Sequence, residues 1–387
     1  MLGWLAELEQ TFGIGPLRLF GYISSRVVFA ALTAYLLMMI VMPPLIRLLR
    51  RLKFGEQGGK NEGAVVVDAM RERKAGTPTM GGVGLIGSVA VAAVLWCDPL
   101  QHYTWIMLTA LLGFGAIGFI DDRTKIVAGA GGLSKRGKLT LQLGLGLGLG
   151  LWILAVDHAQ VWVLRDAVLP GQRPWEFAQT LSAHITLPLI PVEAAIPLGF
   201  GLVVWVVVMT FACSNSVNFT DGLDGLAAGT MLIAVLAFMV IAYLTSRVDA
   251  AAYLRIFYVP GAQEVAVFCA AVAGACLGFL WFNAAPAEIF MGDTGSQALG
   301  GALAVIATCV KQEFLLLLVG FVFFLEGASV AIQVASYRLR GGKRVFLCAP
   351  IHHHFQYLGW PETRIVTRFW IMAALATLVA LASLKLR

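Results

Sequence analysis

The chain has 387 residues, of which 59% are hydrophobic and only 13% are charged, and its mean hydropathy is +0.82. Such an apolar composition excludes a soluble globular domain and indicates an integral membrane protein. The formal net charge of +6 would suggest nucleic-acid binding in a soluble protein, but here we interpret Lys and Arg as markers of cytoplasmic loops and expect no nucleic-acid partner.

Long apolar stretches predict about ten membrane-spanning helices within a single membrane domain at 1–387. About 20 apolar residues cross the hydrocarbon core as a helix, and the alternating strands that a membrane barrel needs are not evident. The charged segment KQE divides the eighth span from the ninth. The fold class is therefore all-α and polytopic, with spans expected at 25–47, 79–97, 104–120, 139–156, 196–213, 225–245, 263–281, 297–310, 314–336 and 368–385.

The distribution of Lys and Arg predicts the orientation of these spans. One set of alternate loops (47–78, 121–138, 214–224, 282–296 and 337–368) contains 19 of the 28 Lys and Arg residues. Cytoplasmic loops carry this excess, so both termini are predicted to be periplasmic. The long loop at 157–195, with room for a short interfacial segment, is predicted to be periplasmic too.

The unusual polar motifs all fall on the predicted cytoplasmic side, which suggests one shared site. They are RKAGTPTMGG before the second span, FIDDR after the third, CSNSVNFTDGLDG after the fifth, FNAAPAEIFMGDTGS after the seventh and APIHHHF before the last. The expected active-site loops are therefore 50–78, 121–138, 214–224, 282–296 and 337–367.

Each acidic motif also has a plainer interpretation. Asp221 or Asp224 could cap the next helix, and Asp-Gly is a common turn. One cap, however, does not require the four side chains Asn215, Asn218, Asp221 and Asp224 at three-residue spacing.

Asp121 and Asp122 could form a solvated helix end, although the helix dipole disfavours acids there. Because adjacent helical residues point about 100° apart, one of the two can face a ligand while the other holds a structural partner. Asp293 or Ser296 in GDTGS could be a cap. The alternative is an anion site at a helix N-terminus, where an acid suits a metal that bridges to phosphate.

The three histidines of APIHHHF are by default a solvated loop, and a phosphate-binding or proton-handling role for one or two of them is the sharper alternative. Glu326 lies within the ninth span. A carboxylate within a membrane is often functional, but we favour a hydrogen bond to a neighbouring helix.

Several carboxylates without a Cys or His ligand pattern suit a hard cation, above all Mg²⁺, which prefers one or two carboxylates together with substrate phosphates. Lys74 and Lys138 can offset phosphate charge. These features favour phosphoryl transfer at the inner membrane face. The alternative is an ion-coupled transporter, but transporter sites usually lie near the midplane in repeated halves, and only Glu326 fits that expectation.

Five motifs carry a resemblance to a known family: GTPTMGG, GFIDDR, NSVNFTDGLDGLA, FNAAPAEIFMGDTGS and APIHHHF, followed by RFW at the last span. The chain resembles the phospho-N-acetylmuramoyl-pentapeptide-transferases, a branch of the polyprenyl-phosphate N-acetylhexosamine-1-phosphate transferase superfamily. PIHHHF and TPTMGG favour this branch over the sister branch that uses UDP-N-acetylglucosamine. Two departures are the long 157–195 loop and Phe219, where Leu is more usual.

The resemblance implies transfer of phospho-N-acetylmuramoyl-pentapeptide from UDP-N-acetylmuramoyl-pentapeptide to undecaprenyl phosphate, which gives lipid I and UMP. It implies Mg²⁺ as cofactor, a lipid-embedded homodimer and location in the bacterial inner membrane with a cytoplasmic active site. By motif position, Asp293 would bind the metal and Asp121 would be the base at the lipid phosphate.

The remaining site residues follow from the same resemblance. Asp122 would lie beside the base, and Asp221, Asn218 and His352 would act at the diphosphate. Asp224, Phe290 and Lys74 would hold uridine, and Lys138 would lie near the phosphate. The other expected substrate-binding residues are Thr79, Asn215, Asn283, Ser296, Gln333, His353 and His354.

Overall fold

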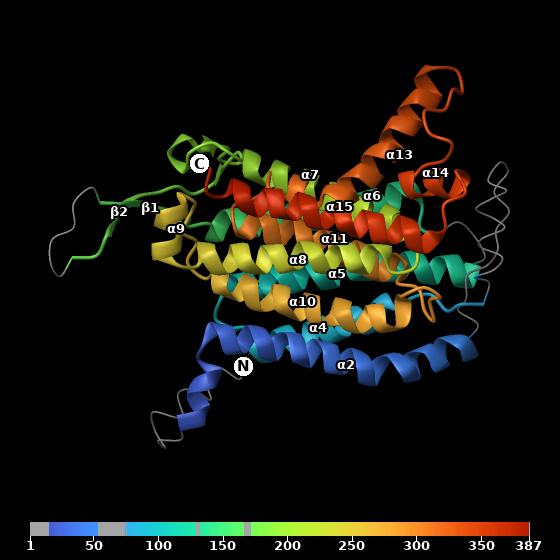
Figure 1. The fold of residues 1–387 in the computed structure, drawn as a ribbon, viewed down its shortest axis with the longest axis horizontal. Helices are drawn as coiled ribbons and strands as arrows, with labels where there is room; N and C mark the ends of the chain where they lie inside the picture. The colour runs from blue at the N-terminus through green and yellow to red at the C-terminus, as the bar shows by residue number, and fades with distance from the viewer. Residues whose placement is uncertain (1–14, 53–73, 75, 129–131, 166–171, 387) are drawn as a thin grey trace.

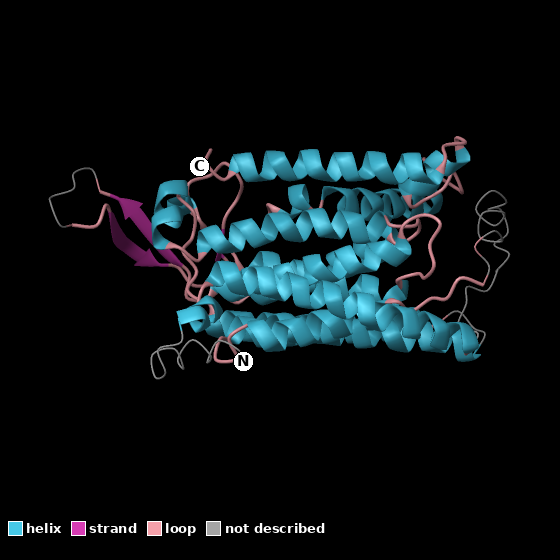
Figure 2. Cartoon of the chain, turned by 60° about the horizontal axis from the view of Figure 1, so that its bottom comes forward, coloured by secondary structure: helices cyan, strands magenta, loops and turns pink. Residues whose placement is uncertain are grey.

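A computed structural model describes residues 15–52, 74, 76–128, 132–165 and 172–386 (Figure 1). The long helices run side by side along one axis, and strands occur at one end of the bundle (Figure 2). The helices are η2 (Gly15–Phe20), α2 (Ile23–Arg51), α4 (Gly82–Trp96), α5 (His102–Ala128), α6 (Lys135–Val156), η3 (Val192–Ala194), α7 (Gly201–Thr220), α8 (Leu226–Thr245), α9 (Val248–Leu254), α10 (Ala262–Asn283), α11 (Gly292–Cys309), α12 (Leu316–Val319), α13 (Phe321–Leu339), α14 (Ile351–Tyr357) and α15 (Glu362–Ser383). The strands are β1 (Gln160–Leu164), β2 (Trp175–Thr180), β3 (His184–Ile185) and β4 (Ile196–Pro197).

The structure confirms an all-α, polytopic membrane protein. Seven of the described helices are long and apolar enough to cross a membrane: α2, α5 over His102–Ile126, α6, α7, α8, α10 and α15. Helix α4 is apolar but shorter. Helices also occupy the regions of the eighth and ninth expected spans, where α11 ends at Cys309 and α12 begins at Leu316. The number of crossings and the side on which the termini lie stay predictions.

Several helix ends differ from the expected boundaries, and some of these ends carry site residues. Helix α5 continues to Ala128 and α7 to Thr220, whereas α11 already begins at Gly292. Asp121, Asn218 and Asp293 therefore lie on helices, although the sequence analysis placed them in or at loops. Polar residues continue a helix where neighbouring helices satisfy them, so a hydropathy window ends a span too early.

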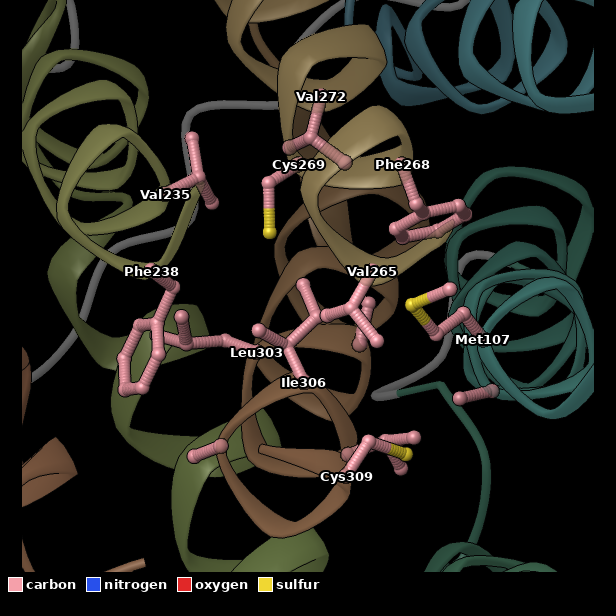
Figure 3. Packing of buried hydrophobic residues seen from close by; sticks show 14 of the residues in the cluster. Met107, Val235, Phe238, Val265, Phe268, Cys269, Val272, Leu303, Ile306 and Cys309 are labelled. Carbon is pink, nitrogen blue, oxygen red and sulfur yellow. The ribbon is translucent and has the colours of Figure 1, made fainter. Parts of the chain in front are cut away.

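Helix α11 lies at the centre of the bundle and packs against α5, α7 and α4. Every residue from Thr294 to Cys309 is buried. Figure 3 shows Leu303, Ile306 and Cys309 of this helix among apolar side chains of α5, α8 and α10. A Cβ at Gly118 of α5 would collide with the backbone of Asp293. Only glycine allows so close an approach, which brings the end of α5 against the start of α11.

Two small antiparallel sheets and α9 form one end of the bundle, away from α14 (Figure 1). Strand β1 pairs with β2, with a bulge between Val161 and Trp162, and β3 pairs with β4. The start of α2 and the end of α15 lie at this same end (Figure 1). The sequence analysis expected a loop with a short interfacial segment here and missed the strands, because they are too short to show a clear period-two pattern.

Candidate active site

Two carboxylates from different helices share the same pair of lysines. Oδ2 of Asp121, on α5, and Oδ2 of Asp293, in the first turn of α11, each lie within 3.2 Å of Nζ of both Lys125 and Lys138. Oδ1 of Asp121 accepts the backbone N–H of Leu133 at 2.7 Å. The four charged groups therefore form one network at the ends of three helices, because Lys138 belongs to α6.

Asp122 holds the start of α11. Met291, which precedes this helix, supplies no capping side chain. Instead, Asp122 of α5 accepts the backbone N–H groups of Asp293 and Thr294 at 3.1 and 2.9 Å and the Thr294 hydroxyl at 2.7 Å. A carboxylate that satisfies orphan N–H groups and faces the positive end of the dipole stabilises the helix.

Asn218 joins α7 to the same place. Its Nδ2 donates to Oδ1 of Asp293 and to Oγ of Ser296, both at 2.9 Å. One helical turn earlier, Asn215 donates to Oε1 of Gln142 at 3.2 Å. Gln142 in turn donates to Gln297 on α11, whose Nε2 donates to Oδ2 of Asp293 at 3.4 Å. A continuous line of carboxamide contacts therefore leads from the interior of the bundle to Asp293.

Asp221 lies in the turn between α7 and α8 and keeps partial exposure. Desolvation raises the pKa of Asp221 well above its usual value, and the negative charges of Asp293 and Asp122 act in the same direction, against a hydrogen bond from Gly292. The pKa of Asp221 is therefore raised by burial first and by the neighbouring carboxylates second. A cation bound here would lower it again.

A second group of contacts surrounds Lys74. Its Nζ lies 2.5 Å from Oδ1 of Asp224 and 2.6 Å from Oε1 of Glu362, and 5.8 Å from the centre of the Phe290 ring. Burial lowers the pKa of Lys74, but hydrogen bonds to the two carboxylates outweigh this and raise it overall. Glu362 also accepts the backbone N–H of Asp224, and the other Asp224 oxygen accepts that of Ala287.

His352 is fully buried on α14, at the end of the bundle away from the sheets (Figure 1). Its Nδ1 lies 3.1 Å from Oε2 of Glu326, which is also fully buried. Its Nε2 faces the turn that contains Asp221, because a Cβ at Gly222 would collide with this atom.

The carboxylates form no ready-made metal cage. Within the described ranges, no three His, Cys, Asp or Glu side chains are close enough together to hold a metal ion.

Comparison with known proteins identifies the family. The model of Glycosyl transferase family 4 matches residues 104–311, more than half of the chain. A phospho-N-acetylmuramoyl-pentapeptide-transferase of Solibacter usitatus (strain Ellin6076) is 43% identical over 379 residues, which cover 97% of both chains. Proteins of the same name from Koribacter versatilis (strain Ellin345) and Protochlamydia amoebophila (strain UWE25) are 40% and 38% identical, over 100% and 98% of each chain. The chain belongs to the phospho-N-acetylmuramoyl-pentapeptide-transferases.

Membership of the phospho-N-acetylmuramoyl-pentapeptide-transferases confirms the resemblance and favours a transferase over the transporter and over the sister branch. The geometry unites most of the expected residues in two groups. The acid cluster comprises Asp121, Asp122, Asp293, Lys138, Asn218 and Ser296, with Asp221 and His352 beside it. The Lys74 group comprises Lys74, Asp224 and Phe290.

Other expected residues make contacts within the framework of the site. Thr79 lies beside Gly292, and Asn283 binds the backbone of Gly225 and Ile289. Gln333 accepts the N–H groups of Val345 and Phe346.

Two of the three histidines also bond within the last loop and α14. Nδ1 of His354 accepts the N–H of Leu347, and His353 bonds Gln356. These contacts brace the last loop and do not reach the acid cluster.

Lys125 and Glu362 belong to the site but were not predicted from the sequence. Lys125 follows Asp121 by four residues, which is about one helical turn, but the third expected span ends at residue 120, before both of them. Glu362 is the first residue of α15, where an acid is usual at a helix start and so gave no signal. Its pairing with Lys74 joins residues that lie 288 positions apart in the chain.

Asp122→Asn should destabilise the protein, because the amide nitrogen would face N–H donors of α11. We expect a loss of about 1–3 kcal/mol in the free energy of unfolding, measured as a lower thermal midpoint in detergent. Thr294→Val removes only the hydrogen bond from the hydroxyl. Its thermal midpoint should therefore lie between that of Asp122→Asn and that of the original protein. An unchanged midpoint for Asp122→Asn would contradict this capping role.

Glu362→Gln should loosen Lys74 without touching the acid cluster. We expect the KM for a UDP-linked donor to rise about fivefold, roughly 1 kcal/mol, with kcat nearly unchanged. Glu288→Gln, the same change at an exposed carboxylate on the neighbouring loop, is the control and should leave KM as it was. An equal fall in kcat would place Glu362 in the chemical step instead.

Proposed function

We propose that the chain transfers phospho-N-acetylmuramoyl-pentapeptide from UDP-N-acetylmuramoyl-pentapeptide to undecaprenyl phosphate, at the cytoplasmic face of the bacterial inner membrane. The family assignment supports this reaction. The observation that carries the proposed mechanism is that Asp121 and Asp293, 172 positions apart in the chain, share Lys125 and Lys138. Opposite charges arranged in this way can bind a diphosphate and a metal together.

The Lys74 group is proposed to hold the uridine end of the donor. Phe290 offers a ring face for stacking, and Asp224 offers a carboxylate to the donor N–H of the base. Lys74 is fixed between Asp224 and Glu362, so it is ordered before the donor arrives. Preordered groups lose less entropy on binding.

Mg²⁺ is proposed to bind at Asp293, whose carboxylate is exposed at one edge and has Asn218 and the two lysines as neighbours. When bound, the ion would neutralise the diphosphate and the leaving UMP. Asp122 fixes the backbone of Asp293 through its N–H, so it acts as a positioning residue. Asn218 orients the carboxylate from the α7 side.

Asp121 is proposed to accept a proton from the lipid phosphate, or to orient it for attack. A lipid phosphate oxygen attacks the phosphorus that carries the sugar. The bond from that phosphorus to the oxygen of UMP breaks, and UMP leaves with the electron pair. Lys125 and Lys138 offset the charge of the phosphates, while Asp221 and His352 act at the diphosphate.

Release of UMP by purified protein in detergent tests this proposal. With undecaprenyl phosphate and Mg²⁺, UMP should appear from UDP-N-acetylmuramoyl-pentapeptide and not from UDP-N-acetylglucosamine. A chelator should stop the release, and added Mg²⁺ should restore it. Faster release from UDP-N-acetylglucosamine would favour the sister branch, and no release without sealed vesicles would favour a transporter. The homodimer stays a prediction, which the mass of the particle in detergent will test.

A further inference from the structure

The buried pair of Glu326 and His352 joins two elements of the site that are distant in sequence. Glu326 lies on α13, which tilts away from the other helices, and His352 lies on α14 beside it (Figure 1). Both side chains have no exposed surface. Their contact at 3.1 Å involves Nδ1 of the imidazole and Oε2 of the carboxylate.

The charge of Glu326 sets the direction of this contact. An ionised Glu326 can only accept, which requires the hydrogen on Nδ1 of His352. Within the described residues, Nε2 of His352 and Oε1 of Glu326 have no hydrogen-bond partner. A buried polar atom without a partner is costly unless a ligand or water satisfies it. Nε2 is the atom that faces Gly222, next to Asp221.

We propose that Glu326 is a positioning residue for His352: it holds the Nδ1–H tautomer and the ring orientation, and so directs Nε2 at the Asp221 turn, which borders the proposed diphosphate site. This inference rests on the transferase activity proposed above. A carboxylate that orients a histidine from behind is a recurrent arrangement at sites where the other ring nitrogen acts on a substrate. Glu326 makes the hydrogen bond to a neighbouring helix that the sequence predicted. Under this proposal, the same bond also orients a residue of the site.

The first test is a double-mutant cycle on the full chain, measured as UMP release. Glu326→Gln, which preserves shape, should lower kcat by about 10-fold to 100-fold and change the donor KM by less than about threefold. In a His352→Ala background the same change should lower the residual rate by less than about twofold. Residues that act as a unit are non-additive in this way. Equal losses in both backgrounds would overturn the proposal.

Ser329→Ala is the matched control. Ser329 is buried on the same helix, and its hydroxyl bonds only the backbone oxygen of Glu326 in the contacts described. This variant should keep the original rate. Thermal unfolding of each variant in detergent separates a loss of fold from a loss of orientation.

The second test needs no change at Glu326. In protein labelled with ¹⁵N-histidine, the resonances that vanish in His352→Ala belong to this ring. A protonated Nδ1 supports the proposal, and a bare Nδ1 overturns it. If the unchanged protein releases no UMP, the proposed function fails; if it releases UMP but Nδ1 is bare or the cycle is additive, this inference alone fails.

Discussion

Asp293→Asn should reduce the rate of UMP release by about 10³-fold, roughly 4 kcal/mol of transition-state stabilisation. The amide keeps the shape of the side chain but removes the charge that both Lys125 and Lys138 contact. It also removes the proposed ligand of Mg²⁺. The measurement is the initial rate at saturating Mg²⁺ and saturating donor.

Asp249→Asn is a control of the same chemical type. Asp249 is exposed, pairs with Arg247 and belongs to α9, at the end of the bundle away from the acid cluster. This variant should release UMP at the original rate. The Asp293 variant also loses the charge that both lysines contact, so its thermal midpoint is measured beside the rate to separate a loss of fold from the loss of a metal ligand. Near-normal turnover of Asp293→Asn would remove this residue from the metal site.

Asp121→Asn should lower kcat by about 10²-fold to 10³-fold while the donor KM changes by less than about threefold. The carboxylate lies at the lipid-acceptor side of the proposed reaction and shares its lysines with Asp293, not with the Lys74 group. Its loss should therefore affect the attacking group more than donor binding. Steady-state rates over a range of donor concentrations measure this separation.

Arg123→Gln is a positional control for Asp121→Asn, because Arg123 lies two residues away on α5 and is exposed. It should leave both kcat and KM nearly unchanged. If Asp121→Asn instead raised KM and left kcat intact, Asp121 would belong to the nucleotide site.

The sequence predicted the helical membrane fold because burial in lipid imposes long apolar runs. It failed at helix ends, where polar residues continue the helix. The first half of α7 is apolar, but its last turns carry Asn215 and Asn218, which bond to Gln142 and Asp293. These partners come from other helices, so only the assembled bundle shows that the helix continues.

The sequence predicted most residues of the candidate site but not all of the contacts between them. Motifs with several acids and amides predicted that their residues share one site, and contacts among Asp121, Asn218 and Asp293 confirm that these residues meet. Their side of the membrane stays a prediction. The sequence predicted that Asp121 and Asp122 point in different directions and have different partners. Which N–H groups and lysines they contact depends on the position of α11 and its first turn.

Glu362 and the pairing of Glu326 with His352 arise from contacts between distant segments, which local patterns do not encode. Lys125 lies one helical turn after Asp121 and was missed because the expected span ended before it.

The complete burial of α11 has a consequence for how such a protein can vary. A helix that is packed on all sides, with glycine at its closest contacts, accepts few larger side chains, because overpacking strains both partners. Asp293 is carried by this rigid element, whereas Lys74, Asp224 and Phe290 lie on connecting segments. Mutation can therefore reshape the proposed nucleotide site far more freely than it can shift the carboxylate of the proposed metal site.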